Sequence, residues 1–116
     1  MKKLLVLGVI TACLLGPQAN AQNITLRYAH SCAEWANARS GGYDFSRGLA
    51  EGWLVGLLDG FAVTVRRDIW STGAGLEPDQ VFYWMDRYCE KNPLGITPSG
   101  AVELMTERLG DGWNAR

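Results

Sequence analysis

Two cysteines, Cys32 and Cys89, place the strongest constraint on how this chain folds. They matter because the chain opens like a secretory leader, with a short basic start, an apolar run over residues 4–16 and a cut expected after Ala21. An exported chain meets an oxidising compartment, where an even pair of cysteines most simply forms one disulfide. The alternative for this pair is two free, buried thiols.

The expected cut divides the chain into a signal peptide, residues 1–21, and one mature domain, residues 22–116. We therefore expect a periplasmic protein. Cys13 offers an alternative, because Ile10-Thr11-Ala12-Cys13 matches a lipoprotein-type box in which this cysteine would be lipidated. No segment of the mature chain reaches the roughly 18 apolar residues that a membrane span needs, so we expect none.

The charge balance argues against two classes of partner. Two of the eleven Lys/Arg residues lie in the leader, which leaves nine against twelve acidic residues and a net charge of −3. A mildly acidic domain lacks the basic footprint of a nucleic-acid-binding protein. It also lacks the polybasic segment that attracts anionic lipids.

Hydrophobic spacing in the mature chain is helical throughout, and no alternating strand pattern of useful length appears. The first helix is expected over residues 25–39, or from Ser31 if Ser31 and Glu34 form a capping box. The others are expected from Asp44 or Ser46 to about Val65, from Pro78 to Asn92-Pro93, and from Thr97-Pro98 to Gly110 or Gly112. The sequence thus predicts an all-α, four-helix, single-domain bundle. Its disulfide would staple the first helix to the third, with Trp35 and Met85 beside the sulfurs.

The second helix carries two stripes at a spacing of four residues. One is apolar: Phe45, Leu49, Trp53, Leu57 and Phe61. The other is the glycine set Gly48, Gly52, Gly56 and Gly60. Each glycine inside a helix costs roughly 0.8–1 kcal/mol against alanine, so something must offset this loss. We expect a neighbouring helix of the same bundle to pack tightly on the glycines, with a homodimer seam as the alternative.

A search for catalytic and ligand-binding residues finds little. His30 is the only histidine, and no nucleophile motif accompanies it. A metal site needs several ligands, and the two thiols are expected to be oxidised. Acidic pairs such as Asp86 with Glu90, and Glu103 with Glu107, are interpreted as solvated helix faces. We therefore expect no catalytic residue, no metal, no cofactor and no enzyme activity.

The segment Arg66-Arg67-Asp68-Ile69-Trp70 is the candidate for binding a partner, through Arg66, Arg67 and Trp70. Arginine and tryptophan are favoured in interface hot spots, and loops commonly carry recognition. Residues 68–70 are expected to form a short helical turn. The alternative is that Trp70 tucks under the loop as a core residue.

Three motifs together resemble known families of small exported helical proteins. They are Cys32-x-x-Trp35, the run Gly52-Trp53-Leu54-x-Gly56-x-x-x-Gly60, and Trp84-x-x-x-Tyr88-Cys89-x-x-Asn92-Pro93-Leu94. The chain looks like the HdeA/HdeB acid-chaperone group, and it is also similar to the Rap/Tai immunity proteins. The resemblance spans Leu26 to Leu109, and the tyrosine-cysteine-asparagine-proline segment is its most specific part.

The two families imply different functions. Similarity to the immunity proteins implies an inhibitor that binds a cell-wall amidase toxin in the periplasm, often as a dimer, with the loop from Arg66 to Leu76 as the candidate contact. Similarity to the acid chaperones implies a dimer that loosens in acid and exposes apolar surface to unfolded clients. Both are non-enzymatic protein-binding functions, and we expect the inhibitor first and the chaperone second.

Overall fold

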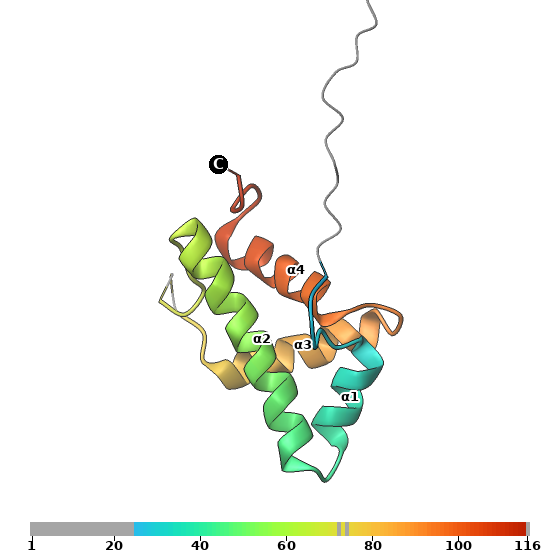
Figure 1. Cartoon of the computed structure of the whole chain (residues 1–116). Helices are drawn as coiled ribbons and strands as arrows, with labels where there is room; N and C mark the ends of the chain where they lie inside the picture. The colour runs from blue at the N-terminus through green and yellow to red at the C-terminus, as the bar shows by residue number, and fades with distance from the viewer. Residues whose placement is uncertain (1–24, 72, 74, 116) are drawn as a thin grey trace, which may run out of the picture.

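A computed structural model describes residues 25–71, 73 and 75–115. The expected signal peptide and the alternative lipidation at Cys13 lie outside these residues. The described chain forms four helices: α1 (Cys32–Ser40), α2 (Asp44–Val65), α3 (Pro78–Lys91) and α4 (Thr97–Leu109), as Figure 1 shows. Its extended backbone pairs only at an isolated bridge between Ser31 and Ile96. The predicted all-α, four-helix bundle is confirmed.

Local chemistry explains where α1 begins. Ser31 is its N-cap, and its hydroxyl accepts from the Glu34 amide while the Glu34 carboxylate accepts from the Ser31 amide. This capping box satisfies two amides that would otherwise lack partners. Residues 25–30 are not helical, and Tyr28 adopts a left-handed conformation with φ of 62°. The start at Ser31 is therefore correct, and the longer helix from Thr25 is wrong.

The starts of α2, α3 and α4 follow the sequence signals closely. Pro78 lies in the first turn of α3, where Glu77 and Gln80 form a second capping box. α2 begins at Asp44 and α4 at Thr97, although each is capped by the preceding residue without a side-chain bond. The expected helical turn at 68–70 is wrong, because this stretch is a bend organised by Asp68.

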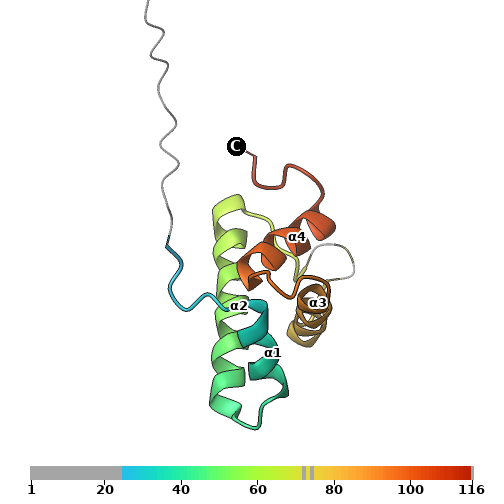
Figure 2. The same cartoon turned by 90° about the vertical axis from the view of Figure 1, so that its right-hand side faces the viewer.

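The helices form a ring in which α1 contacts α2 and α3, and α4 also contacts α2 and α3. Figure 2 shows that α1, α3 and α4 lie on the same side of α2. The core between them consists of apolar side chains that are nearly inaccessible to solvent: Cys32, Trp35, Ala38, Ala50, Leu54, Leu58, Ile69, Val81, Phe82, Met85, Cys89, Ala101, Leu104, Met105, Leu109 and Trp113.

The face that α2 turns inward overlaps only in part with the apolar stripe in its sequence. Its buried residues are Ala50, Leu54 and Leu58. Phe45, the first residue of the expected apolar stripe, is 81% exposed, and Leu49 is 45% exposed. The other end of the stripe reaches the core, because Leu57 and Phe61 pack against it. The stripe thus marks the inner face only in part, because α2 is apolar on most of its circumference and spacing alone does not select that face.

The expectation that another helix of the bundle packs on the glycine stripe is wrong. Gly48, Gly52, Gly56 and Gly60 are all exposed, and a Cβ atom added to any of them would meet nothing within 4 Å. The glycines lie on the side of α2 that faces away from the core. Nothing in the described chain therefore offsets their cost.

By length and composition alone, α2 would also suffice to cross a membrane, and 17% of its most apolar 18-residue window is buried. A single helix of this kind is a weak indication, since core helices of soluble proteins meet the same criterion. Within α2, Arg47 and Glu51 approach Arg39 of α1, so charged groups belong to its inner contacts.

Candidate partner-binding site

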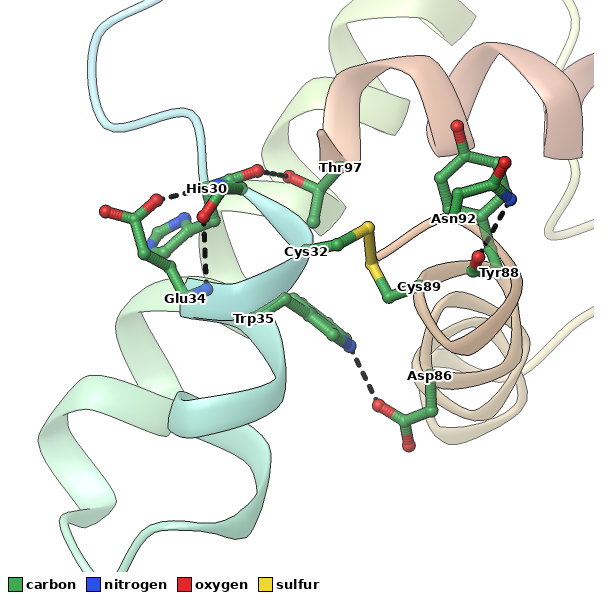
Figure 3. The surroundings of a disulfide bond; sticks show 10 residues. His30, Cys32, Glu34, Trp35, Asp86, Tyr88, Cys89, Asn92 and Thr97 are labelled. Atoms are coloured by element: carbon green, nitrogen blue, oxygen red, sulfur yellow. Dashed lines mark hydrogen bonds between the residues drawn. A yellow bond between two sulfur atoms is a disulfide. The ribbon is translucent and has the colours of Figure 1, made fainter. Parts of the chain in front are cut away.

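A disulfide between Cys32 and Cys89 joins α1 to α3, as predicted, with Cα atoms 4.9 Å apart (Figure 3). The two cysteines are separated by 57 residues in sequence. Trp35 and Met85, which were expected beside the sulfurs, are both fully buried in the same core. The bond therefore fixes the first helix against the third inside the core rather than at the surface.

Backbone hydrogen bonds tie the same end of α1 to the connection between α3 and α4. The Cys32 amide donates to Gly95 O at 2.9 Å, and the Thr97 amide and hydroxyl both donate to His30 O. Asn92 closes α3 by donating its side-chain amide to Tyr88 O (Figure 3). The Tyr88-Cys89-x-x-Asn92-Pro93 segment, the most specific part of the resemblance, is thus a structural corner.

Arg39 joins three helices in a charged cluster that the sequence did not reveal. From α1, its guanidinium donates to both carboxylate oxygens of Asp86 on α3, at 3.0 and 2.9 Å, and to Glu51 on α2 at 2.6 Å. The indole of Trp35 donates to the same Asp86 carboxylate at 2.8 Å. Asp86 was interpreted as solvated with Glu90, whereas its partners lie 47 and 51 residues away in sequence.

The Arg39 guanidinium also lies over aromatic rings, with its central carbon 5.7 Å from the Phe82 ring and 5.9 Å from the Tyr83 ring. Hydrogen bonding to Asp86 is the main cause that raises the pKa of Arg39 above its ordinary value. Because each of the three guanidinium nitrogens of Arg39 donates to a carboxylate, the cluster holds α1, α2 and α3 together. A groove of about 360 Å³ runs beside it, lined in part by Ala36, Ser40 and Glu90.

His30 packs against an aromatic side chain. Its ring makes an edge-to-face contact with Trp53 at 6.4 Å between centroids. Its Nδ1 atom is buried without a hydrogen-bond partner. Among the described residues, no group of three or more histidine, cysteine or acidic side chains is arranged to hold a metal ion.

The predicted binding segment begins where α2 ends, at Arg66. Arg66 adopts a left-handed conformation with φ of 56° and ψ of 34°, and its side chain is exposed. Glycine is the usual residue at such a helix end, because a Cβ atom is unfavourable there. An arginine at this position keeps a strained backbone and points a charge outward. Backbone strain of this kind is common at functional sites.

The rest of the segment is anchored to the fold by its own side chains. The Asp68 carboxylate accepts from the amides of Trp70 and Ser71 at 2.8 and 2.7 Å, and also from the Ser71 hydroxyl. The backbone bond from Ser71 is the main cause that lowers the pKa of Asp68. Ile69 is 1% exposed and Leu76 N donates to Ile69 O. The bend is therefore preformed.

The three residues proposed for partner binding differ in their environment. Trp70 is half-buried, and its indole donates to Asp59 of α2 at 2.9 Å, so it behaves largely as the alternative interpretation expected. Arg67 is exposed but donates to Leu109 O at 3.1 Å. Arg66 remains as the residue of the three that is displayed outward without a hydrogen bond to the described chain.

A hollow of about 680 Å³ adjoins this loop, and no sequence pattern indicated it. It is lined by residues from the end of α2, from α4 and from the C-terminal segment: Phe61, Thr64, Val65, Arg67, Val102, Gly112, Trp113, Asn114 and Ala115. Trp113 packs on Phe61 with ring centroids 5.3 Å apart and donates to the Thr106 hydroxyl. An apolar hollow with an arginine at its edge suits an inserted side chain of a partner protein.

Comparison of the chain with protein-family models, with curated proteins and with solved structures found no match. The functional interpretation therefore depends on the loop, on the hollow beside it and on the surface of α2.

Proposed function

We propose that this protein is an exported, non-enzymatic binding module that acts in the periplasm as an immunity-type inhibitor of a cell-wall amidase toxin. One observation carries the proposal: Arg66 is displayed in a left-handed conformation at the edge of a loop that Asp68 and Ile69 hold rigid. A preformed loop binds with a small loss of conformational entropy, which suits an inhibitor.

Charge and compartment support the same proposal. The mature domain is acidic overall, yet Arg66 and Arg67 place two positive charges together at this loop. An arginine can form bidentate bonds to a partner's carboxylate, and the neighbouring hollow can take an apolar side chain. The disulfide between α1 and α3 suits a protein that works outside the reducing cytoplasm.

The test uses the oxidised mature protein and a charge reversal at the loop, Arg66→Glu. Wild type immobilised in a periplasmic extract should retain a peptidoglycan amidase and inhibit its release of dye from labelled cell walls. Arg66→Glu should weaken inhibition at least tenfold. The matched control is Arg87→Glu, which reverses an exposed charge on α3 and should inhibit like wild type. Wild-type protein that neither retains nor inhibits any amidase would refute the proposal.

A second candidate, an acid-stress chaperone, is favoured by the exposed apolar side of α2. In this case acid would loosen the contacts that Arg39 makes among three helices. Sedimentation and tryptophan fluorescence from pH 7 to pH 2 test this candidate, together with protection of an unfolding client at about pH 2–3. A chain that stays compact and leaves clients unprotected at that pH excludes the chaperone.

A further inference from the structure

The groove between α3 and α4 is a further concave region, and the proposed function does not use it. It consists of two hollows of about 290 and 370 Å³. Three residues line both hollows, which therefore adjoin: Trp84, Arg87 and Glu107. Along α3 the groove extends from Gln80 to Lys91, about 16 Å at 1.5 Å per residue. This shape suits an elongated ligand.

Aromatic rings on α3 line this groove. The Trp84 and Tyr88 rings are stacked, with centroids 5.6 Å apart and an angle of 9° between their planes. The indole of Trp84 donates to the Glu107 carboxylate on α4 at 2.7 Å, which holds the pair in place. Tyr83 adds a third ring that is 62% exposed, and the Arg39 guanidinium lies over it. Tyrosine and tryptophan offer a large contact surface at a small cost in conformational entropy.

Several polar groups of the groove keep unused hydrogen-bonding capacity. Three cations and one carboxylate there form no ion pair within the part of the chain that the structure describes: Arg87, Lys91, Arg108 and Glu103. Burial raises the pKa of the Tyr88 hydroxyl, and the negative charge of Glu103 raises it further. This hydroxyl therefore stays protonated, and it makes no hydrogen bond to the described residues. The groove thus presents free donors and free acceptors beside aromatic rings.

This combination of groups fits the chemistry of a sugar. A sugar ring has an apolar C–H face that packs on an aromatic ring, and a rim of hydroxyl groups that both donate and accept hydrogen bonds. A protein partner fits less well, because the centre of a protein interface is depleted of lysine and glutamate. A nucleic-acid strand is disfavoured as well, since Glu103 and Glu107 would repel its phosphates.

The charge of the groove indicates that the sugar is acidic. Three cations and two carboxylates line it, so that the groove has a small positive excess in a domain whose net charge is −3. One of the carboxylates, Glu107, already accepts from Trp84. Arginine binds a carboxylate through two parallel hydrogen bonds. We propose that the groove between α3 and α4 binds an oligosaccharide chain whose sugars carry carboxylate groups.

Titration calorimetry of the oxidised mature protein with defined glycans tests the ligand class. The carboxylated probes are peptide-free strands of alternating N-acetylglucosamine and N-acetylmuramic acid, and fragments of a polyuronate. The neutral probe is an N-acetylglucosamine oligomer of similar length. At least one carboxylated probe should bind about tenfold more tightly than the neutral one, because charge-assisted hydrogen bonds contribute more than neutral ones. The probe that binds identifies cell-wall glycan or a uronic-acid polysaccharide as the source. Binding of neither, or no preference over the neutral oligomer, would overturn the proposal.

A charge reversal tests the place of binding. Arg87→Glu changes an exposed residue that lines both hollows, and it should weaken binding of the carboxylated glycan by about tenfold or more. The matched control, Arg27→Glu, makes the same exchange at an exposed site outside the groove and should bind like wild type. Arg87→Glu that binds like wild type would overturn the proposal. An acidic peptide that binds the wild type more tightly than either carboxylated glycan would replace the sugar by a protein partner.

The indole N–H signals in the NMR spectrum locate the ligand in wild-type protein. The Trp84 indole lies in the groove, whereas the Trp113 indole lies against Phe61 in the hollow beside the loop. Single exchanges to phenylalanine, Trp84→Phe and Trp113→Phe, assign the two signals. Added glycan should shift the Trp84 signal and leave the Trp113 signal in place. A shift of the Trp113 signal alone would place the glycan in the other hollow and contradict the assignment.

This inference goes beyond the proposed function and does not depend on it. Arg87→Glu should lose the glycan and still inhibit the amidase, because inhibition is assigned to the loop at Arg66. Arg66→Glu should lose inhibition and still bind the glycan. Wild type that binds the glycan but inhibits no amidase would refute the proposed function alone. Loss of both activities in each of the two variants would indicate a single site and would overturn the separate groove.

Discussion

The helices α2 and α4 both contain glycine, and the comparison separates two reasons for its presence. Gly100 of α4 is buried, and a Cβ atom there would lie 2.7 Å from both Met85 Sδ and the Tyr88 ring. Gly56 of α2 is exposed, and a Cβ atom there would meet nothing within 4 Å. The first glycine is required by the packing of the chain, whereas no contact within the described chain requires the second.

The same contrast extends to the two halves of the molecule. The covered corner, where α1, α3 and the start of α4 meet, is held by the disulfide, by the Ser31–Ile96 bridge and by the Arg39 cluster. The exposed side of α2, which carries Gly48, Gly52, Gly56 and Gly60, has none of these. Stability should therefore depend on the corner more than on that side of α2.

The largest effect on stability is expected at the disulfide. Replacing both residues, Cys32→Ser with Cys89→Ser, should lower the free energy of unfolding by about 4 kcal/mol, since the bond closes a long loop in the unfolded chain. Urea unfolding of the oxidised wild type and the double variant measures the difference. Reduced wild type serves as the control and should unfold like the variant. Equal midpoints for the oxidised wild type and the variant would mean that the corner does not limit stability.

The next effect is expected at Arg39. Arg39→Met keeps most of the apolar stem but removes the cation that pairs with Asp86, and it leaves Glu51 only Arg47 at 4.0 Å. The side chains of this cluster are 19–28% exposed. We expect a loss of about 2 kcal/mol, less than the 3–5 kcal/mol for a fully buried pair. Arg87→Met, at an exposed site on α3, should change stability by less than about 0.5 kcal/mol. Similar urea midpoints for the two variants would contradict the role given to the cluster.

The direct test of the comparison is one substitution at two glycines. Gly100→Ala should destabilise by about 1 kcal/mol net, because overpacking against the Tyr88 ring exceeds the gain in helix propensity. Gly56→Ala should stabilise the dilute monomer by about 1 kcal/mol. Thermal melts of wild type and both variants at low protein concentration show whether each substitution raises or lowers the stability. If Gly56→Ala also destabilised the monomer, the exposed side of α2 would have a contact within the chain.

How far the sequence predicts this structure depends on how local the signal is. The capping box at Ser31 and the proline of α3 are encoded by neighbouring residues, and the disulfide was expected from the even pair of cysteines; all three are confirmed. The inner face of α2 was predicted only in part, because Leu49 and Leu54 are equally apolar, and only the position of α1 and α4 distinguishes them. The Asp86–Arg39 bond was missed because no local pattern pairs residues 47 positions apart.

The candidate binding site was predicted only in part, because some of its contacts join residues that are distant in sequence. Arg66 could be selected because a basic, aromatic loop stands out in an acidic domain. The hydrogen bond from Trp70 to Asp59, and the hollow between α2, α4 and residues 112–115, arise from tertiary packing. Sequence patterns report what one segment prefers, whereas the hollow exists only where three segments meet.

A smaller effect is expected where α2 ends. Arg66→Gly removes the Cβ atom from a left-handed position, and we expect a gain of about 0.5 kcal/mol after the greater entropy of glycine in the unfolded chain is subtracted. Arg66→Ala is the control, because it removes the charge but keeps the Cβ strain, so it should give no gain. Thermal melts measure the stability of both variants. A gain with alanine equal to that with glycine would show that the charge, and not the backbone, is unfavourable.

The smallest effect concerns acid and the start of α1, at the covered corner. The Ser31 amide donates to the Glu34 carboxylate, which lowers the pKa of Glu34 below its ordinary value. A lowered pKa in the folded state means that the carboxylate stabilises the fold above the unfolded value of about 4.3, and that this contribution is lost as pH falls through the lower folded value. Glu34→Gln keeps an oxygen acceptor for the Ser31 amide but does not titrate. The melting temperature of wild type should therefore exceed that of Glu34→Gln at pH 6, and the difference should vanish as pH approaches 2.5. A difference that stayed constant across this range would show that the capping box works through its geometry alone, so that the charge on Glu34 makes no part of the corner's stability.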